Sequence, residues 1–373
     1  MRLLGLRLHK LEMPLVAPFT TSFSTQTARH PLLVEVTVAM GSDVVTGWGE
    51  CVALDAPVYS EEHLDGAAEV IRRWIAPRLF AAGEFTAETV AWHLSPIIGN
   101  RMAKSAVEMA VLDAQLRHRE QSFAHYLGAT RTSVPSGVSV GIQPSVNELL
   151  DVVSGYVDAG YARIKLKIKP GHDLAEVAAV RERFGSSLPF QVDANTAYTL
   201  ADASHLRALD EYRLLLIEQP LGEQDLRQHA ELARIISTPV CLDESIVTAQ
   251  TAADAIALRA ASIINIKAGR VGGFLEARRI HDVARANGIA VWCGGMLETG
   301  LGRAANIALA ALDGFTLPGD ISGSDRFYVR DITTEPIVMR DGAVEVPTGS
   351  GFGVEIDVET VAKFRQEFTE VRP

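Results

Sequence analysis

The chain has 373 residues, 47% of them hydrophobic and 22% charged, and its formal net charge at pH 7 is −11. This length suits a barrel of about 250 residues plus a second domain, and the negative charge argues against a nucleic-acid-binding surface. No apolar run approaches the roughly 18 residues that a membrane-spanning helix needs, and three widely spaced cysteines without a CxxC pair are typical of a cytoplasmic protein with reduced thiols.

The first 50 residues predict a three-stranded antiparallel sheet. Hydrophobic and polar residues alternate over 4–8 and again over 33–38. A glycine-containing turn at 41–43 follows, and residues 45–50 return the chain alongside the second strand.

Two stretches near the N-terminus predict loops. Residues 17–28 are polar, lack helical or strand periodicity, and contain Phe19 and Phe23. A second loop covers residues 54–59. Loops of this length are functional lids or poorly ordered segments, and we expect the two phenylalanines to close over a bound substrate.

Helices dominate residues 60–128, and short strands alternate with helices from Val134 onward. Apolar residues at helical spacing predict a helix over 102–117, and the alternating part predicts helices such as 174–184 and 274–287. Eight strands are predicted in that part: 136–142, 163–168, 190–193, 214–218, 240–243, 262–267, 290–293 and 315–318.

This order of elements predicts an α/β fold. We expect the eight strands to form a (β/α)7β TIM-type barrel over residues 129–324. Residues 1–128 form an α+β capping domain, and the C-terminal segment, 325–373, returns to it.

Acidic residues recur at the ends of three consecutive barrel strands. Asp193, Glu218 and Asp243 are spaced by about 25 residues, the length of one strand-plus-helix unit with its loops. The carboxyl ends of barrel strands meet at one mouth, where active sites lie. Adjacent carboxylates repel unless a cation neutralises them, and all-oxygen ligation favours Mg²⁺, with Mn²⁺ as a substitute. Asn195 and Glu244 are candidates for positions just behind these ligands.

Lysines end the strands on either side of the carboxylates. Lys165 and Lys167 share one face of their strand, and both point into the barrel because helices cover its outside, whereas Lys169 lies in the following loop. Lys267 ends the sixth strand, on the opposite wall. Each of the two facing lysines, Lys167 and Lys267, can then serve one face of a carbon acid, and a cation nearby is expected to lower the lysine pKa.

One segment matches a different motif. Gly300–Ala305 fits the G-x-G-x-x-A dinucleotide fingerprint, with Asp320 about twenty residues further on. It follows the seventh barrel strand and not the first strand of a nucleotide-binding unit, so we expect no nucleotide cofactor. A helix amino terminus at this place can still hold a substrate carboxylate.

The strand-end residues resemble the enolase superfamily, in its muconate-lactonizing subgroup. The resemblance covers essentially the whole chain and rests on the Lys165-x-Lys167 pair, the three carboxylates and Lys267. Three further segments resemble one branch closely, the o-succinylbenzoate synthase / N-succinylamino acid racemase family: Asn265–Gly273, Trp292–Asn306 and Phe315–Asp320.

The resemblance implies two reactions at one site, both begun by Mg²⁺-assisted removal of a proton α to a carboxylate. One is a syn dehydration in menaquinone biosynthesis, with Lys167 as base and acid and with Lys165 and Lys267 stabilising the enediolate. The other is racemisation of N-acylamino acids, in which the proton passes between Lys167 and Lys267. Arg270 resembles an arginine associated with the racemising branch.

The resemblance also implies the substrate-binding residues, which are Phe19, Phe23, Leu54, Ser139, Asn195, Gly294, Met296 and Leu297. It further implies a small-molecule carboxylate substrate, no nucleic-acid or membrane partner, and a homo-oligomer, either a dimer or an octamer. Dipeptide epimerase and muconate cycloisomerase are alternatives within the superfamily. Two other classes stay open, a Schiff-base aldolase and a barrel scaffold without catalysis.

Overall fold

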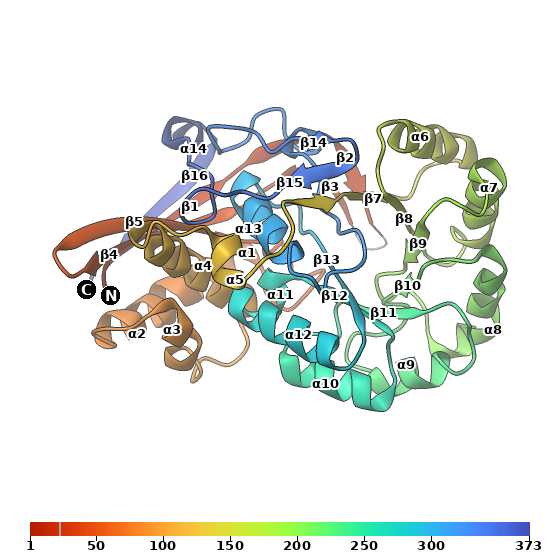
Figure 1. The fold of residues 1–373 in the computed structure, drawn as a ribbon, viewed down its shortest axis with the longest axis horizontal. Helices are drawn as coiled ribbons and strands as arrows, with labels where there is room; N and C mark the ends of the chain where they lie inside the picture. The colour runs from red at the N-terminus through yellow and green to blue at the C-terminus, as the bar shows by residue number, and fades with distance from the viewer. Residues whose placement is uncertain (22–23) are drawn as a thin grey trace.

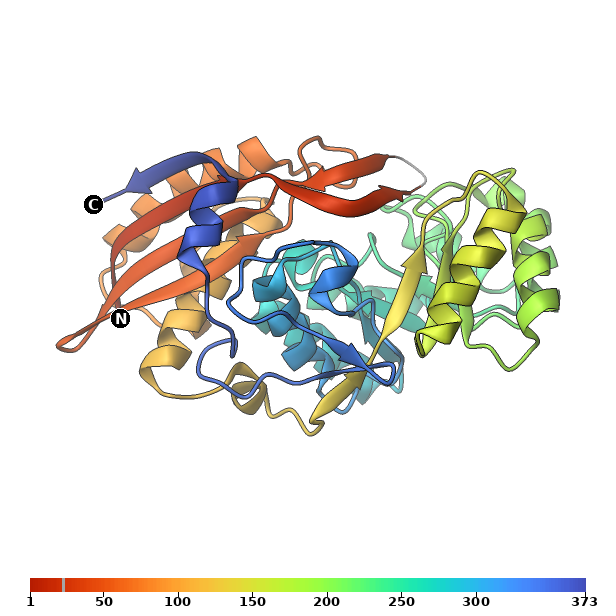
Figure 2. The ribbon, with the colours of Figure 1, turned by 90° about the horizontal axis from the view of Figure 1, so that it is seen from above.

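The computed structural model describes residues 1–21 and 24–373 (Figure 1). Its antiparallel capping sheet has the strand order β16–β1–β4–β5. These strands are β1 (Arg2–Leu11), β4 (Leu32–Met40), β5 (Asp43–Cys51) and β16 (Arg365–Val371). The predicted three-stranded sheet is confirmed, and Figure 2 shows that the last strand of the chain joins it beside β1.

The first predicted loop is instead a β-hairpin, so this prediction was wrong. Strands β2 (Met13–Thr20) and β3 (Thr25–Arg29) pair antiparallel, with Phe19 opposite Gln26. Most side chains of the hairpin are partly or fully exposed, so no alternation of hydrophobic and polar residues marks it in the sequence. Figure 2 shows the hairpin extending from the capping sheet across the barrel. Phe23 lies outside the described residues.

Helices cover one face of the capping sheet. They are α1 (Leu64–Val70), the π-helical turn η1 (Ile71–Ile75), α2 (Ala76–Ala81), α3 (Ala87–His93), α4 (Arg101–His118) and α5 (Phe123–Leu127). Helix α4 packs on β5 at two glycines, where a Cβ at Gly47 would lie 2.2 Å from the carbonyl oxygen of Ala110 and one at Gly49 would lie 2.0 Å from that of Ala106. The helix can approach the strand this closely only because both residues lack a side chain.

The barrel is built on a seven-stranded parallel sheet with the order β13–β12–β11–β10–β9–β8–β7. Its strands are β7 (Gly137–Val140), β8 (Arg163–Lys167), β9 (Phe190–Asp193), β10 (Ile217–Glu218), β11 (Val240–Leu242), β12 (Ile263–Ile266) and β13 (Ala290–Cys293). Seven of the eight predicted strands are therefore present, with shorter bounds at several ends.

The eighth predicted strand, 315–318, forms only isolated parallel bridges. Phe315 bridges to Val291 at one edge of the sheet, and Gly319 bridges to Ser136 at the other. Pro318 has no N–H to donate, so this segment cannot form a continuous ladder. It still lies between the two edges of the sheet and closes the barrel.

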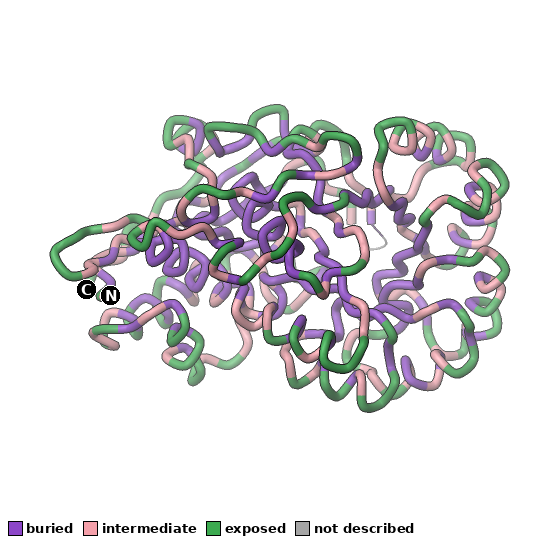
Figure 3. The backbone as a smooth tube through the Cα atoms, in the orientation of Figure 1, coloured by how far each residue is buried: buried purple, intermediate pink, exposed green. Residues whose placement is uncertain are grey.

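Helices surround the barrel on its outside, where Figure 3 shows exposed backbone around a buried interior. They are α6 (Val146–Asp158), α7 (Leu174–Phe184), α8 (Ala203–Leu206), α9 (Leu226–Leu232), α10 (Ala249–Leu258), α11 (Ala268–Val271), α12 (Phe274–Ala286) and α13 (Gly300–Ala310). The two 3₁₀ turns η2 (Leu200–Asp202) and η3 (Arg207–Tyr212) flank α8. The predicted helices over 102–117, 174–184 and 274–287 are confirmed to within one residue at each end.

The last part of the chain contacts both regions. Strands β14 (Met339–Arg340) and β15 (Ala343–Glu345) form a small sheet with β6 (Ser133–Pro135), which directly precedes the barrel. Helix α14 (Val358–Phe364) then leads into β16 and the capping sheet. In the described residues, no helix is long and apolar enough to cross a membrane.

Two buried carboxylates of the capping region bind the N-termini of barrel helices. Glu50, at the end of β5, accepts hydrogen bonds from the backbone N–H of Thr299 at 3.0 Å and of Gly302 at 3.1 Å, at the start of α13. Glu108 on α4 accepts one from the backbone N–H of Leu275 at 3.1 Å, at the start of α12. Both carboxylates satisfy N–H groups that have no partner within their helix, and so join the capping region to the barrel.

These carboxylates make stability depend on pH. Burial raises the pKa of Glu50 and of Glu108 from 4.5 to about 7. A raised pKa of an acid in the folded state gives stability that is present below the unfolded pKa and is lost as pH rises through about 7. The loss is at most on the order of 3 kcal/mol for each carboxyl group.

We therefore expect the urea concentration at the midpoint of unfolding to decrease as the pH is raised from 5.5 to 8.5. This decrease should be smaller in the Glu50→Gln, Glu108→Gln double variant. Glu120→Gln, on an exposed turn after α4, is the control and should keep the full slope. If the urea midpoint of the double variant decreased with pH as steeply as that of the wild type, Glu50 and Glu108 would not be the cause of the pH dependence.

Candidate active site

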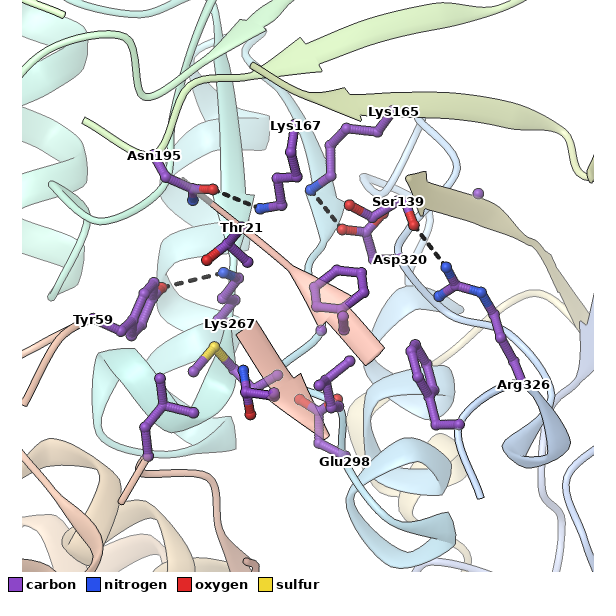
Figure 4. Close-up of a pocket in the computed structure, with 18 of the residues that line it drawn as sticks. Thr21, Tyr59, Ser139, Lys165, Lys167, Asn195, Lys267, Glu298, Asp320 and Arg326 are labelled. Carbon is purple, nitrogen blue, oxygen red and sulfur yellow. Dashed lines mark hydrogen bonds and ion pairs between the residues drawn. The ribbon is translucent and has the colours of Figure 1, made fainter. Parts of the chain in front are cut away.

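A pocket lies where the capping region meets the carboxyl ends of the barrel strands (Figure 4). From the capping region it is lined by Phe19, Thr21, Gln26, Leu54 and Tyr59. The barrel contributes three lysines, Lys165, Lys167 and Lys267. Lys167 ends β8 and Lys267 follows β12, and the sheet order places three strands between them. The pocket therefore receives ammonium groups from two separate parts of the barrel wall.

The three predicted metal ligands end neighbouring strands beside these lysines. Glu218 lies next to Asp193 in the parallel register of β10 and β9, and Asp243 directly follows β11. All three are buried, with at most 1% of their surface exposed. Asn265 donates a hydrogen bond to Glu218 Oε1 at 2.7 Å, and Gln219 Oε1 accepts one from the backbone N–H of Asp243 at 3.0 Å.

Each lysine neutralises one of these carboxylates. The pairs are Lys165 Nζ with Glu218 Oε2 at 2.9 Å, Lys167 Nζ with Asp193 Oδ2 at 2.7 Å, and Lys267 Nζ with Asp243 Oδ2 at 2.8 Å. Within the described ranges, the acidic side chains are not arranged around a common point as three ligands of one bound ion would be. The lysine ammonium groups instead neutralise the negative charge of the carboxylates.

The donor set nevertheless fits a hard divalent cation. The three groups are carboxylates, the ligands that Mg²⁺ and Mn²⁺ prefer. Burial raises the pKa of Glu218, and the negative charge of Asp193 raises it further, which shows that the neighbouring carboxylates repel each other. A bound cation would remove that repulsion and release the lysines toward the pocket.

The pKa of Lys267 differs from the sequence-based expectation. Burial alone lowers the pKa of this lysine, but the acidic groups around it outweigh burial and raise the pKa above its ordinary value. These groups are Tyr59, Glu244, Glu218 and Asp193. The expectation of a lowered lysine pKa assumed a cation that draws the carboxylate charge to itself, and the protein groups by themselves have the opposite effect.

Left-handed backbone occurs at the strand ends around the site. Asn195 and Gln219, which follow the ligands of β9 and β10, have φ values of 42° and 38°, and Leu297 after β13 has a φ of 58°. Residues other than glycine rarely adopt this conformation, and such strain gathers at functional sites. This observation supports a functional role for this end of the barrel.

Most predicted substrate-binding residues line the same pocket. They are Phe19, Leu54, Ser139, Asn195, Met296 and Leu297. Gly294 does not line it, because it packs behind the wall, where a Cβ would lie 2.3 Å from Asn265 Oδ1 and 2.8 Å from Lys267 Cε. Its neighbour Gly295 takes the lining position.

The residues predicted behind the ligands contact them or their neighbours. Glu244 Oε1 accepts a hydrogen bond from Asn195 Nδ2 at 3.0 Å, and burial raises the pKa of Glu244 to about 7. The Arg270 guanidinium forms an ion pair with Asp243. It also donates to the backbone carbonyl of Asn265 at 2.8 Å, which ties the end of β11 to β12.

Sequence reasoning missed two residues that touch the lysines. The Tyr59 hydroxyl accepts a hydrogen bond from Lys267 Nζ at 3.1 Å, and Figure 4 shows the two side chains meeting in the pocket. Asp320 lies 2.6 Å from Lys165 Nζ and 2.9 Å from Arg163 Nη2. Asp320 follows the closing segment of the barrel, so the rule that found the other strand-end acids could have found it.

The amino terminus of α13 is occupied by the protein itself. In addition to Glu50, Asp331 accepts a hydrogen bond from the backbone N–H of Gly300 at 3.0 Å. The expectation that this helix end can hold a substrate carboxylate was therefore wrong, because two side-chain carboxylates already use its N–H groups. The same contacts leave no room for a dinucleotide pyrophosphate at the G-x-G-x-x-A segment.

Comparison with known proteins identifies relatives over the whole length of the chain. Residues 5–128 match the family model of the mandelate racemase / muconate lactonizing enzyme N-terminal domain, and residues 148–361 match that of the enolase C-terminal domain-like family. The solved structure of an enolase superfamily member from Listeria innocua superposes with a TM-score of 0.95 at 40% identity, over 100% of this chain and 99% of that one.

Two curated relatives are similar in sequence. An N-succinylamino acid racemase from Amycolatopsis sp is 60% identical over 368 residues, which is 97% of this chain and 99% of the relative. An o-succinylbenzoate synthase from Geobacillus kaustophilus is 45% identical over 359 residues, which is 96% of this chain and 95% of the relative.

Proposed function

The chain belongs to the mandelate racemase / muconate lactonizing enzyme family of the enolase superfamily, and on this basis we propose that it is an N-succinylamino acid racemase that also acts as an o-succinylbenzoate synthase. The main support for the proposal is that Lys167 and Lys267 both enter one pocket. They come from β8 and β12, which are separated by three other strands of the sheet. A carbon acid held between them presents one face to each lysine. Removal of a proton from one face and its return to the other inverts the carbon.

Each residue of the pocket has its own role in this reaction. One of the two lysines, as the free amine, takes the α-proton from its face of the carbon, and the other, as the ammonium, donates a proton to the opposite face; Lys167 and Lys267 exchange these roles for the other enantiomer. Lys165, held by Asp320 and buried, supplies fixed positive charge to the substrate carboxylate as negative charge develops there. The capping residues Phe19 and Leu54 exclude water from the pocket.

Enzymes of this family generally depend on a divalent metal ion, and Asp193, Glu218 and Asp243 would hold it in this chain, with Mg²⁺ the preferred ion and Mn²⁺ its substitute. When bound, the ion supplies Lewis-acid stabilisation of the negative charge on the substrate carboxylate. Asn195 donates its backbone N–H to Asp193 Oδ1 at 3.0 Å and Arg270 forms an ion pair with Asp243, so these two residues hold two of the carboxylates in place.

The dehydration uses the same pocket in a different way. A syn elimination removes the proton and the hydroxyl from one face, so one lysine can act first as base and then as acid. We assign this role to Lys167, while Lys267 contributes positive charge from the other wall. Two reactions with a common first event thus fit one set of residues.

The experiment that tests the proposal compares two substrates under one set of conditions. With Mg²⁺ present, we expect the purified protein to racemise N-succinyl amino acids and to dehydrate the cyclohexadiene precursor of o-succinylbenzoate. Polarimetry follows the first reaction and ultraviolet absorbance the second. Activity on neither substrate, together with turnover of a dipeptide or of muconate, would replace the proposal by one of the other activities of the superfamily.

A further inference from the structure

Two arginines line the pocket on a wall away from Lys267. Arg303 projects from α13, and Arg326 ends the short 3₁₀ turn η4 (Ser324–Arg326). Figure 4 shows Arg326 across the pocket from Tyr59, Lys267 and Asn195. The pocket therefore carries positive charge at two separated places.

The two places differ in how their charge is balanced. Every lysine of the pocket has a carboxylate partner within 3 Å. Over residues 1–21 and 24–373, neither arginine forms an ion pair with a carboxylate: Arg303 donates to the backbone carbonyls of Glu298 at 2.9 Å and Ser322 at 3.3 Å, and Arg326 donates to that of Ser139 at 2.6 Å. No carboxylate of the described residues therefore pairs with these guanidinium groups.

The acidic side chain nearest in sequence to Arg303, that of Glu298, hydrogen-bonds to another residue. Glu298 lines the pocket, but its Oε1 accepts a hydrogen bond from Asn306 Nδ2 at 3.0 Å, and it forms no ion pair with either arginine in the described structure. Phe327 lies between the arginines, with its ring 5.1 Å from the Arg303 guanidinium carbon and 4.6 Å from that of Arg326. The aromatic face fixes the two guanidinium groups without cancelling their charge.

Polar atoms around this wall also lack partners. The buried Nε atoms of Arg303 and Arg326 have no hydrogen-bond acceptor in the described residues. The buried Oγ of Ser139 also has no hydrogen-bond partner among them. Arg303 is 2% exposed and Ser139 is 7% exposed. Leaving buried charged and polar groups unsatisfied costs free energy, so their presence at a pocket wall points to a ligand that satisfies them.

We propose that Arg326, assisted by Arg303 and Ser139, binds the remote carboxylate of a dicarboxylic N-acyl group such as succinyl. This inference rests on the proposed function, because it places the α-carboxylate of the substrate at the lysine end of the pocket. The planar guanidinium fork matches a carboxylate in geometry and charge. The arginine end then selects acyl groups that carry a terminal negative charge over neutral acyl groups of the same size.

The test compares an N-succinyl amino acid with its N-succinamoyl counterpart, in which a carboxamide replaces the terminal carboxylate. α-Proton exchange in deuterium oxide, followed by NMR, gives kcat/KM for both in the Mg²⁺-loaded enzyme. We expect the wild type to prefer the succinyl substrate by roughly 10- to 100-fold, the range of a hydrogen bond to a charged group. In Arg326→Gln this ratio should fall by about tenfold or more, and Arg326→Lys should retain part of it.

Arg330→Gln is the matched control, because Arg330 is an exposed arginine four residues further on that pairs with Asp357 outside the pocket. It should keep the wild-type ratio. A wild type that exchanges both substrates equally well would overturn the inference and leave the proposed function standing. An Arg326→Gln variant that loses the same factor on both substrates would make Arg326 a structural residue and also overturn the inference. Exchange of neither substrate by the wild type would remove the proposed function, and the inference with it.

Discussion

In deuterium oxide, the Lys267→Ala variant is expected to exchange the α-proton of only one enantiomer of an N-succinyl amino acid, and the Lys167→Ala variant only that of the other. The reason is that the two lysines enter the pocket from strands on different walls, so each reaches one face of the α-carbon. Racemisation needs both and should stop in both variants. NMR of each enantiomer separately measures the exchange.

The dehydration should respond differently to the same substitutions. There Lys267 contributes charge and not proton transfer, yet removal of a fixed positive charge from a preorganised site still lowers the rate by roughly 10²–10³. Lys169→Ala is the control, because this lysine lies two residues beyond Lys167 and does not line the pocket. Exchange of both enantiomers at comparable rates by either single variant would contradict the two-wall geometry.

Removal of divalent metal is expected to abolish both activities, and Mg²⁺ or Mn²⁺ should restore them. The carboxylates at the ends of β9, β10 and β11 then return to their lysine partners, which leaves the lysines unable to take up a proton. Asp193→Asn should prevent restoration at ordinary metal concentrations, because the site loses one of its three negative charges. Calorimetric titration with Mg²⁺ provides a readout that does not depend on turnover.

Asp151→Asn serves as the control for this substitution, since Asp151 is an exposed carboxylate on α6, away from the pocket. It should bind Mg²⁺ and respond to chelation like the wild type. Full activity of the chelated wild type would contradict the metal assignment, and undiminished Mg²⁺ binding by Asp193→Asn would contradict the choice of ligand.

The acidic strand ends were predictable because a parallel barrel repeats one unit. Each strand is buried on both faces, so its hydrophobic run is visible in the sequence, and the charged residue that ends it stands out. The same rule would have identified Asp320, but this residue lies two positions beyond the predicted strand 315–318 and not at its end. Where the repeat is regular, position in the sequence translates directly into position at the barrel mouth.

The capping side of the pocket was harder to predict. Most side chains of the hairpin that carries Phe19 are partly or fully exposed, so its strands show no alternation of hydrophobic and polar residues, and the prediction of a loop failed there. Tyr59 reaches Lys267 across 208 positions of sequence, and no local pattern relates the two residues. Contacts of this kind depend on how the capping region is seated on the barrel.

By itself, the sequence determined the barrel, its strand ends and the three carboxylates with their lysines, because these follow from local periodicity and a constant repeat length. Tertiary structure alone decided how the charges pair. It gave each lysine of the pocket a carboxylate partner and placed Glu50 and Asp331 at the start of α13. Among the described residues, it left Arg303 and Arg326 with backbone acceptors and without an acidic partner. Charge balance depends on distances of a few ångströms between side chains from distant segments, and sequence spacing carries no information about such distances.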